Sequence, residues 1–429
     1  MKEAKLMVAP RLRFPQFQKN GMWKLAELRQ LAECINDRVG NAECTPYTVI
    51  SGVGLVSQQE KLGRTIAGNS IKNYVMLQPD DFAYNKSATR AFPQGFIARY
   101  LGSDRAAVPN SIFTCFRPDK EAVDPAYLDH LFSSNLHGRW LRTRIKVGAR
   151  AHGSLNVSDD DLMALPVPLP DGPTSLQEQQ TVADCLTSLD IAVAAQDEKV
   201  GALKTYKRGL MQQLFPREGE GLPRLRFPEF RDSPDWDEAQ LGDIFDTTSG
   251  GTPNRAEKDY WNGTIPWVTT SLIDFNIITE VNEFISEAGL ANSSAKILPK
   301  DTVLIAMYGQ GKTRARVAML GIAAATNQAC AAILPNKKVN PHFTFVSLCG
   351  RYDEMRKLSN SGGQENLSQS LIRGLSFRYP KNLEEQSKIV GCLSALDLQI
   401  FAESDRLEAL LTHKKGLIQQ LFPSVQEAL

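Results

Sequence analysis

The chain has 429 residues, of which 42% are hydrophobic and 23% charged, and its formal net charge is +1. This length predicts two or more domains, and the composition is that of a globular protein. A net charge near zero excludes a polycation that binds nucleic acid by overall charge, but it allows local basic surfaces balanced by acidic ones.

Targeting segments and metal motifs are missing from the sequence. No apolar run approaches the ~18 residues of a membrane helix, and the N-terminal stretch MKEAKLMVAPRLRFP lacks the apolar core of a secretion signal. The seven cysteines are dispersed without CxxC spacing, and the five histidines form no HExxH-like pair. We therefore expect a cytoplasmic protein with reduced thiols and no metal site.

The sequence contains an internal duplication. A lead-in segment at residues 10–28, PRLRFPQFQKNGMWKLAEL, returns at 223–241 as PRLRFPEFRDSPDWDEAQL. EQQTVADCLTSLD (178–190) and KRGLMQQLFP (207–216) both return 207 residues later. Weaker matches at a shift of 220 pair Pro46, Ser51, Pro79 and Asp81 with Pro266, Ser271, Pro299 and Asp301. Two copies are too few for a solenoid, so this pattern predicts a tandem duplication with pseudo-twofold symmetry.

The first variable block, within residues 1–172, is predicted to be strand-rich. Residues 45–57, 72–85 and 110–118 alternate β-branched or aromatic residues with turn formers, and a helical stretch follows at 124–145. The second variable block, within 217–380, repeats this order. Its strands are expected at 265–273, 301–308, 316–325 and 329–335, and its helical stretch at 340–360. The fold class is therefore α+β.

The segments 173–216 and 381–423 are each predicted to be one long helix, because apolar residues recur at alternating spacings of four and three. Over this many repeats the pattern indicates an antiparallel coiled coil. Prolines Pro173, Pro216 and Pro423 lie at the helix edges. The predicted core is Val182, Leu186, Leu189, Val193, Val200, Leu203, Leu210 and Leu214 of the first helix with Ile389, Leu393, Leu396, Ile400, Leu407, Leu410, Leu417 and Leu421 of the second.

The register of the two helices follows from matched polar interruptions of the apolar pattern. Aligning Val182 with Leu421 and Leu214 with Ile389 predicts that Lys207 lies beside Asp397 and that Lys414 lies beside Asp190. A separation above about 10 Å between these side chains would refute that register. The alternative is two amphipathic helices, each packed on its own core.

The stretch GQGKT, at residues 309–313, resembles the end of a phosphate-binding P-loop. A Walker A loop needs GxxxxGK[ST] followed at once by a helix. The first glycine of that pattern falls on Ala306, and the residues after Thr313 are typical of a strand. We interpret the stretch as a basic turn between strands, although an ATPase remains an alternative that ATP binding lost in Lys312→Ala would identify.

Basic turns of this kind suit DNA, because Lys and Arg neutralise phosphates while Arg, Lys, Asn and Gln read base edges. The candidates in the first block are Lys86, Ser87, Thr89, Arg90, Arg99, Asn110, Arg150, His152 and Asn156. Those in the second block are Tyr308, Gln310, Lys312, Thr313, Arg314, Arg316, Asn327, Gln328, Gln364 and Asn366. No nucleophile with a base and an orienting group can be assembled, so no catalytic residue is predicted.

These landmarks together resemble the specificity subunit of type I restriction-modification systems. The features that carry the resemblance are the two PRLRFP…W segments, the block GQGKTRARVAMLGIAAATNQACAAI and the two helices that end in QQLFP. The resemblance runs from Pro10 to Pro423. The first block departs from it in lacking the glycine-rich turn, which leaves the role of Lys86 to Arg90 open.

The resemblance implies a recognition subunit without a catalytic site or a cofactor of its own. Two target recognition domains, each reading half of a bipartite asymmetric DNA site, would be joined by a helix pair that sets their spacing and docks two modification subunits. S-adenosylmethionine would then bind the modification subunits, and ATP and Mg the restriction subunits. The alternative is a scaffold without DNA, whose coiled coil joins two ligand-binding domains. Salt-dependent DNA binding would separate the two readings.

Overall fold

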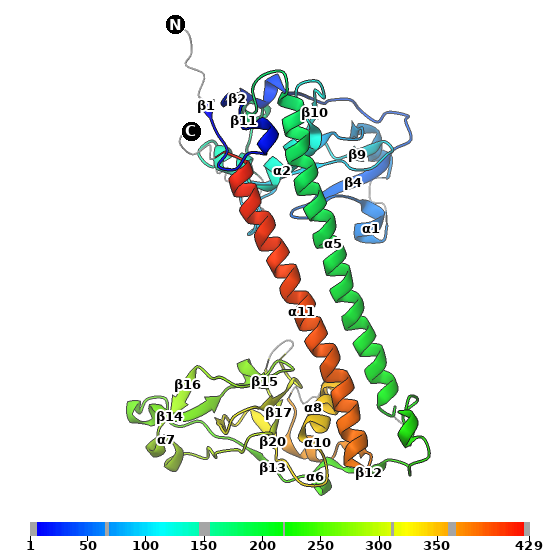
Figure 1. The fold of residues 1–429 in the computed structure, drawn as a ribbon, viewed down its shortest axis with the longest axis vertical. Helices are drawn as coiled ribbons and strands as arrows, with labels where there is room; N and C mark the ends of the chain where they lie inside the picture. The colour runs from blue at the N-terminus through cyan, green and yellow to red at the C-terminus, as the bar shows by residue number, and fades with distance from the viewer. Residues whose placement is uncertain are drawn as a thin grey trace. The chain divides into compact units, whose positions relative to one another are not determined.

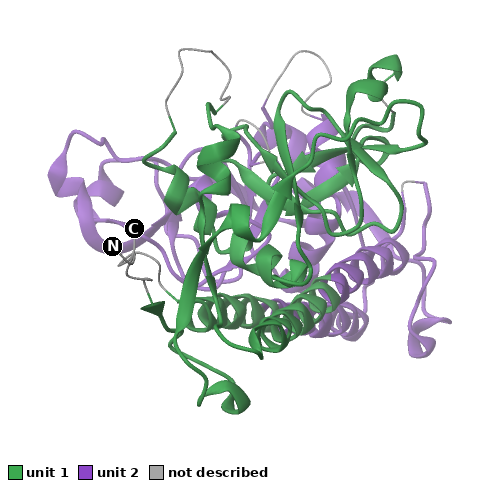
Figure 2. Ribbon diagram, turned by 90° about the horizontal axis from the view of Figure 1, so that it is seen from above, with its two compact units in different colours: residues 1–197, 405–429 green, residues 198–404 purple. Residues whose placement is uncertain are grey.

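The computed structural model describes residues 7–64, 68–145, 155–217, 219–309, 313–358 and 366–423. The chain forms two compact units: unit 1 comprises residues 1–197 and 405–429, and unit 2 comprises residues 198–404 (Figure 2). Unit 1 therefore contains two segments that are far apart in the sequence, one before and one after unit 2. The predicted division into four segments, with boundaries at 172, 216 and 380, stays a prediction.

Two long helices dominate the element order, α5 (Ser175–Leu214) and α11 (Leu383–Leu421) (Figure 1). Residues 175–197 of α5 and 405–421 of α11 belong to unit 1, and the remainder of both helices belongs to unit 2. The prediction of two long helices that pack together is confirmed. No position of the predicted apolar seam is exposed: each is buried or half-buried.

Within each unit the two helices run antiparallel. In unit 1, Val182 and Leu186 share a core with Leu421, and Lys414 forms an ion pair with Asp190. In unit 2, Leu214 shares a core with Ile389, and Lys207 Nζ lies 2.5 Å from Asp397 Oδ1. Lys199 Nζ also lies 2.5 Å from Glu403 Oε1. The predicted register is confirmed, because both Lys–Asp pairs that define it form.

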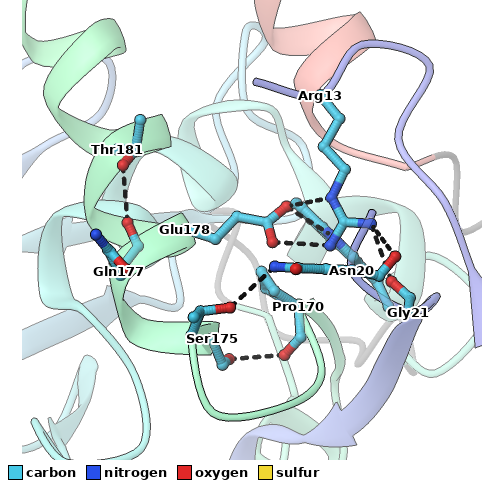
Figure 3. Close-up of polar contacts among 10 residues, drawn as sticks. Arg13, Asn20, Gly21, Pro170, Ser175, Gln177, Glu178 and Thr181 are labelled. Carbon is cyan, nitrogen blue, oxygen red and sulfur yellow. Dashed lines mark hydrogen bonds and ion pairs between the residues drawn. The ribbon is translucent and has the colours of Figure 1, made fainter. Parts of the chain in front are cut away.

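The duplicated lead-in segment anchors each variable block to the start of a long helix. Figure 3 shows the Arg13 guanidinium facing the Glu178 carboxylate, with the carbonyl groups of Asn20 and Gly21 on the guanidinium as well. Arg13 Nε and Nη2 donate to the two Glu178 oxygens at 2.7 and 2.8 Å. Trp23 Nε1 donates to the same carboxylate at 3.1 Å, and the Glu178 side chain is only 1% exposed. One buried carboxylate therefore organises this joint.

Unit 2 repeats this joint residue for residue. Arg226 donates to both oxygens of Glu385 at 2.7 and 2.8 Å, and Trp236 Nε1 donates to Glu385 at 3.2 Å. The lead-in segment also reaches the C-terminal end of the other long helix in each unit. Leu12 N–H donates to the Gln420 carbonyl, and Leu225 N–H donates to the Gln213 carbonyl. The two most strongly repeated motifs, PRLRFP and QQLFP, thus contact each other, which satisfies a carbonyl at a helix end.

The glutamine after each anchoring glutamate ties the long helix to a shorter one. Gln179 Oε1 accepts from Asp124 N–H at 2.9 Å, next to α2 (Pro125–Ser133). Gln386 Oε1 accepts from Asn340 N–H at 2.7 Å, next to α8 (Pro341–Gly350). The duplicated Glu–Gln pair therefore holds a lead-in segment with one side chain and a block helix with the other.

The described residues of unit 1 form three sheets. The central four-stranded sheet has the order β3-β10-β7-β8, and the others have the orders β5-β4-β9-β6 and β1-β2-β11. Their strands are β1 (Met7–Val8), β2 (Trp23–Glu27), β3 (Ala32–Cys34), β4 (Thr45–Ile50), β5 (Gly54–Ser57), β6 (Val75–Leu77), β7 (Phe82–Asn85), β8 (Phe96–Arg99), β9 (Ala106–Val108), β10 (Phe113–Pro118) and β11 (Pro166–Leu169). The short helices are α1 (Gln58–Leu62), α2, α3 (Leu136–Leu141) and α4 (Asp159–Met163). The predicted helical stretch 124–145 breaks at Asn135, whose φ of +60° interrupts the helix.

Unit 2 has a central sheet of the order β13-β20-β17-β18-β15, with smaller sheets β16-β14-β19 and β12-β21. Its strands are β12 (Asp237–Gln240), β13 (Thr247–Ser249), β14 (Trp261–Val268), β15 (Ile277–Ile278), β16 (Glu283–Ile285), β17 (Val303–Ala306), β18 (Val317–Leu320), β19 (Ala325–Thr326), β20 (Cys330–Ile333) and β21 (Ser376–Tyr379). Its short helices are α6 (Leu241–Ile244), α7 (Glu287–Ala291), α8, α9 (Tyr352–Leu358) and α10 (Gln369–Arg373). Strands β17, β18 and β20 are buried along their whole length, which explains their unbroken apolar sequences.

The duplication extends into the variable blocks, because β10-β7-β8 and β20-β17-β18 share their order and antiparallel pairing. Asp80 N–H donates to the Tyr100 carbonyl and Asp301 N–H to the Leu320 carbonyl, and both aspartates have positive φ, 76° and 69°. The structure thus equates Asp301 with Asp80, so the predicted match to Asp81 is wrong by one residue. The equivalent residues are those that adopt left-handed φ in the turn. The sequence alone does not show which of the two consecutive aspartates, Asp80 or Asp81, this is.

Candidate DNA-binding surface

In unit 2, three loops that carry predicted DNA-contacting residues meet at the end of β17. Met307 N–H donates to the Ala329 carbonyl at 2.8 Å, and Leu367 N–H donates to the Met307 carbonyl at 3.0 Å. These two bonds bring Tyr308, Gln328 and Asn366 into one neighbourhood. All three are exposed, and the Tyr308 side chain is 42% exposed.

Other predicted contact residues near these loops have partners within the protein. Asn327 Oδ1 accepts from Ala329 N–H at 3.1 Å and from Cys330 Sγ at 3.2 Å, so it stabilises the turn before β20. Arg316 Nη1 lies 2.8 Å from Asp274 Oδ1. Thr313 and Arg314 are half-buried on the chain leading into β18, and the Arg314 carbonyl accepts from Arg356 Nη1 at 3.5 Å.

The Gln328 side chain is positioned by a residue that the sequence did not single out. Thr252 Oγ1 donates to Gln328 Oε1 at 2.6 Å, which leaves the Gln328 amide nitrogen as the donor. Thr252 follows Gly250 and Gly251, and a Cβ on Gly250 would lie 1.8 Å from the Thr326 carbonyl oxygen. Only glycine allows this loop to pack so closely on the strand before Gln328. The dipeptide Gly–Gly before Thr–Pro was the available sequence signal.

Unit 1 repeats the loop arrangement with different side chains. Lys86 N–H donates to the Ile112 carbonyl at 3.0 Å, and Leu155 N–H donates to the Lys86 carbonyl at 2.7 Å. The loop after β7, the segment before β10 and the segment before α4 therefore converge as their counterparts do in unit 2. Arg90, Asn110 and Asn156 are exposed in these loops.

Lys86 and Asn110 line a small polar cavity of about 90 Å³, together with Cys34, Thr114 and Asp159. Lys86 Nζ lies 3.3 Å from Asp159 Oδ1, and Thr114 Oγ1 donates to the same oxygen at 2.7 Å. Burial, reinforced by the Asp159 charge, raises the pKa of the Cys34 thiol. The cysteine therefore stays protonated, and the cationic groups that line this cavity are Lys86 and Arg38.

Several predicted contacts in unit 1 have local structural partners. Arg99 donates to Asp80 Oδ1 through Nε and Nη2 at 2.9 and 2.6 Å, and Lys120 Nζ binds the other Asp80 oxygen at 2.6 Å. Arg99 thus serves an ion-pair network at the end of β8, away from the converging hydrogen bonds of Lys86. Thr89 Oγ1 accepts from Phe92 N–H, and Ser87 N–H donates to Asn85 Oδ1. Of these three residues, Arg99 is the least suited to DNA contact.

Five of the predicted contact residues lie outside the described residues: Arg150, His152, Gln310, Lys312 and Gln364. The residues that flank the GQGKT stretch are described, and they can be compared with those of a P-loop. Position 306 is Ala306 at the end of β17, and Thr313 to Arg316 lead into strand β18 rather than a helix. A Walker A loop needs a helix there, so the interpretation as a turn between strands agrees with the fold.

The described part of the chain contains no group of three His, Cys, Asp or Glu side chains arranged to hold a metal. Among those same residues, no helix has the length and apolar content of a membrane span.

A second cavity, of about 630 Å³, is an open groove beside α11 lined by Phe227, Leu383, Glu384, Ser387, Lys388, Gly391 and Cys392.

Comparison with known proteins shows what the chain is similar to. Residues 234–412 match the model of the type I restriction modification DNA specificity domain. The chain is 24% identical over 264 residues to the EcoR124I/EcoR124II specificity subunit of Escherichia coli, covering 60% of this chain and 62% of that subunit. It is 23% identical over 335 residues to the putative MjaX specificity subunit of Methanocaldococcus jannaschii, covering 76% of this chain and 74% of that one. Its alignment with the E. coli relative therefore spans less than two thirds of that protein.

Solved structures share the fold. A chain from a study of complex assembly in a type I R-M system matches with a TM-score of 0.58 at 17% identity, covering 94% of this chain and 98% of that one. The S subunit of a type I system from M. genitalium matches with a TM-score of 0.56 at 16% identity, covering 97% and 99%. Residues 234–412 thus match a type I restriction modification DNA specificity domain, the curated relatives are specificity subunits, and the chain as a whole is similar in fold to S subunits of type I systems.

Proposed function

We propose that each unit reads one half of a bipartite, asymmetric site in double-stranded DNA. The observation that carries this proposal is the repeated convergence of three loops at the end of β7 and of β17, each organised by the same pair of backbone hydrogen bonds. The scaffold is the same in both units, whereas the side chains differ. Two different half-sites are the expected outcome of such a pair.

The chemistry of the exposed side chains suits this role. Amides such as Gln328 and Asn366 pair with adenine in the major groove, while Lys and Arg pair with guanine or with phosphates. In unit 1 the corresponding groups are Lys86, Asn110 and Asn156. Thr252 acts in unit 2 as a positioning residue, because its hydroxyl fixes which end of the Gln328 amide faces outward.

The paired helices would act as the spacer between half-sites and as the docking element for two modification subunits. A rigid spacer makes recognition depend on the distance and angle between half-sites along the duplex. In this proposal the chain performs no catalysis: the modification subunits bind S-adenosylmethionine and methylate DNA, and the restriction subunits use ATP and Mg. The relatives named above are specificity subunits, which supports this division of labour.

The two-reader proposal is tested by mapping methylation after co-expression with a modification subunit of the same system. We expect Gln328→Ala/Asn366→Ala to relax base preference in one half of the methylated sequence and Lys86→Ala/Asn110→Ala to relax the other half. Each lost base contact should cost about 1–3 kcal/mol of discrimination. Arg224→Ala, which removes an exposed cation paired with Glu220, is the control. If both halves change together in either variant, the assignment of one reader per unit is wrong.

The spacer role has a separate test. Inserting one heptad into both helices at matched positions should lengthen the unread centre of the site, whereas insertion into one helix alone should abolish recognition because it breaks the register. An unchanged spacer in the double insertion would contradict the proposal.

A further inference from the structure

The structure places a basic helix end beside the candidate reading loops in each unit, although the two segments do not match in sequence. We propose that these ends, after α3 in unit 1 and at α9 in unit 2, bind phosphates of the DNA backbone. This inference rests on the proposed function, and it assigns a sequence-independent contact that is separate from the reading of bases.

In unit 1 the end of α3 is fixed next to the loops of Lys86. His137 Nε2 lies 3.3 Å from the carbonyl oxygen of Gly95, in the chain between β7 and β8. Trp140 Nε1 donates to the Asp161 carbonyl at 2.9 Å, in α4, and Asp159 of the same helix pairs with Lys86. The α3 end, α4 and Lys86 therefore belong to one connected surface.

The arginine at this end is held in one orientation. The Arg144 guanidinium lies 3.2 Å from the centre of the Trp140 ring, and its Nη1 donates to the Trp140 carbonyl at 3.1 Å. Within the described residues, Arg144 Nε and Nη2 make no hydrogen bond and Arg144 has no carboxylate partner. The stacking on Trp140 and the hydrogen bond to its carbonyl restrict the Arg144 side chain before any ligand binds. Less conformational entropy is therefore lost when a phosphate binds the parallel N–H groups of Nε and Nη2.

Two exposed arginines, Arg142 and Arg144, carry the positive charge of this end. Arg142 is exposed and, in the part of the chain that the structure describes, forms no ion pair. In the acidic run Asp159 to Asp161 of α4, Asp159 is paired with Lys86 and Asp161 accepts from Ser158 Oγ at 2.6 Å. Asp160 lies 3.9 Å from Arg29, which pairs more closely with Glu27, at 2.8 Å.

Unit 2 also has an arginine beside an aromatic ring at its helix end, with a different geometry. Arg356 in α9 lies 5.5 Å from the centre of the Tyr352 ring, and its Nη1 donates to the Tyr352 hydroxyl at 3.1 Å. The same nitrogen reaches the Arg314 carbonyl, so the helix is joined to the loop before β18. Lys357 is exposed next to it. An aromatic ring four residues before an arginine thus occurs in both units at the helix that adjoins the candidate reading loops.

The test measures how DNA affinity of the full chain depends on salt. A duplex of about 40 base pairs carrying a fluorophore is titrated at several KCl concentrations between about 50 and 200 mM, where a phosphate contact contributes about −0.9 to the slope of log K against log salt. Arg142→Ala/Arg144→Ala should reduce the magnitude of the slope by about 1.8 if both arginines bind phosphate, and Lys357→Ala by about 0.9. For each lost contact, the loss of affinity should be about 3.5-fold larger at 50 mM than at 200 mM.

The controls separate this inference from charge loss and from the proposed function. Lys19→Ala removes an exposed cation from the lead-in segment and should leave the slope unchanged. Arg142→Lys/Arg144→Lys keeps the charge and should keep the slope. The reduction should be equal on two duplexes of unrelated sequence. An unchanged slope in Arg142→Ala/Arg144→Ala, or a reduction confined to one sequence, overturns the phosphate contact. If the parent chain binds no duplex at 50 mM, the proposed function fails, and the phosphate contact fails with it.

Discussion

Replacing Glu385 by glutamine tests how strongly the unit 2 joint depends on one buried carboxylate. The change keeps the shape and removes the charge that Arg226 and Trp236 share. Breaking a buried pair by removing one partner costs about 3–5 kcal/mol, because the remaining charge is left uncompensated. Arg226 is 8% exposed but still donates to the carbonyls of Ser233 and Pro234, so we expect the lower part of this range, about 3 kcal/mol.

This loss can be measured by urea unfolding followed by circular dichroism. A slope of about 2–3 kcal/mol per M urea turns 3 kcal/mol into a midpoint shift of about 1–1.5 M. Glu384→Gln is the matched control, because it makes the same chemical change one residue earlier on an exposed side chain. The double variant Arg226→Leu/Glu385→Leu should lose less than the two single variants added together. A shift below about 0.3 M for Glu385→Gln, or full additivity, would refute the reasoning.

Three further predictions follow from the same structure. Lys207→Ala should cost less than about 1 kcal/mol, because its partner Asp397 is 54% exposed; a double-mutant cycle with Asp397→Ala measures the coupling, and a value above 2 kcal/mol would contradict this. Burial lowers the pKa of His137 to about 4, so the folded state binds its proton less tightly than the unfolded state does. About 3 kcal/mol of stability should therefore be lost as pH falls from 6.5 to 4, and urea midpoints across that range should fall less steeply in His137→Gln. Gly250→Ala should destabilise unit 2 by more than about 2 kcal/mol, since its Cβ would meet the Thr326 carbonyl, and a Tm equal to that of the parent would show that the loop can move aside.

The helix register could be predicted from the sequence because it depends on local periodicity alone. Apolar spacing fixes which face of each helix is buried, and two matched lysine–aspartate pairs then leave one antiparallel alignment. The order of the strands in the two variable blocks was harder to predict from the sequence. The equivalence of Asp301 with Asp80 becomes visible only through the backbone bonds of the turn.

Side-chain partners in the candidate surface could not be predicted, because they depend on contacts between segments far apart in sequence. Arg99 and Asn327 have the residue types that read DNA, yet each bonds a neighbour that stabilises a turn or an ion-pair network. Thr252 reaches Gln328 across 76 residues. The anchoring role of Glu178 was equally hidden, since Arg13 is 165 residues away in the chain.

The composition of unit 1 has a consequence for synthesis on the ribosome. Its core around Val182 and Leu186 includes Leu421 and Phe422, and its lead-in segment bonds Gln420. All residues of unit 2 are translated before these three. Unit 2 can therefore finish folding first, while the first block keeps apolar surface uncovered until residues 405–422 have been translated. Premature termination near residue 404 would yield a chain whose first half, although fully translated, lacks the piece that completes it.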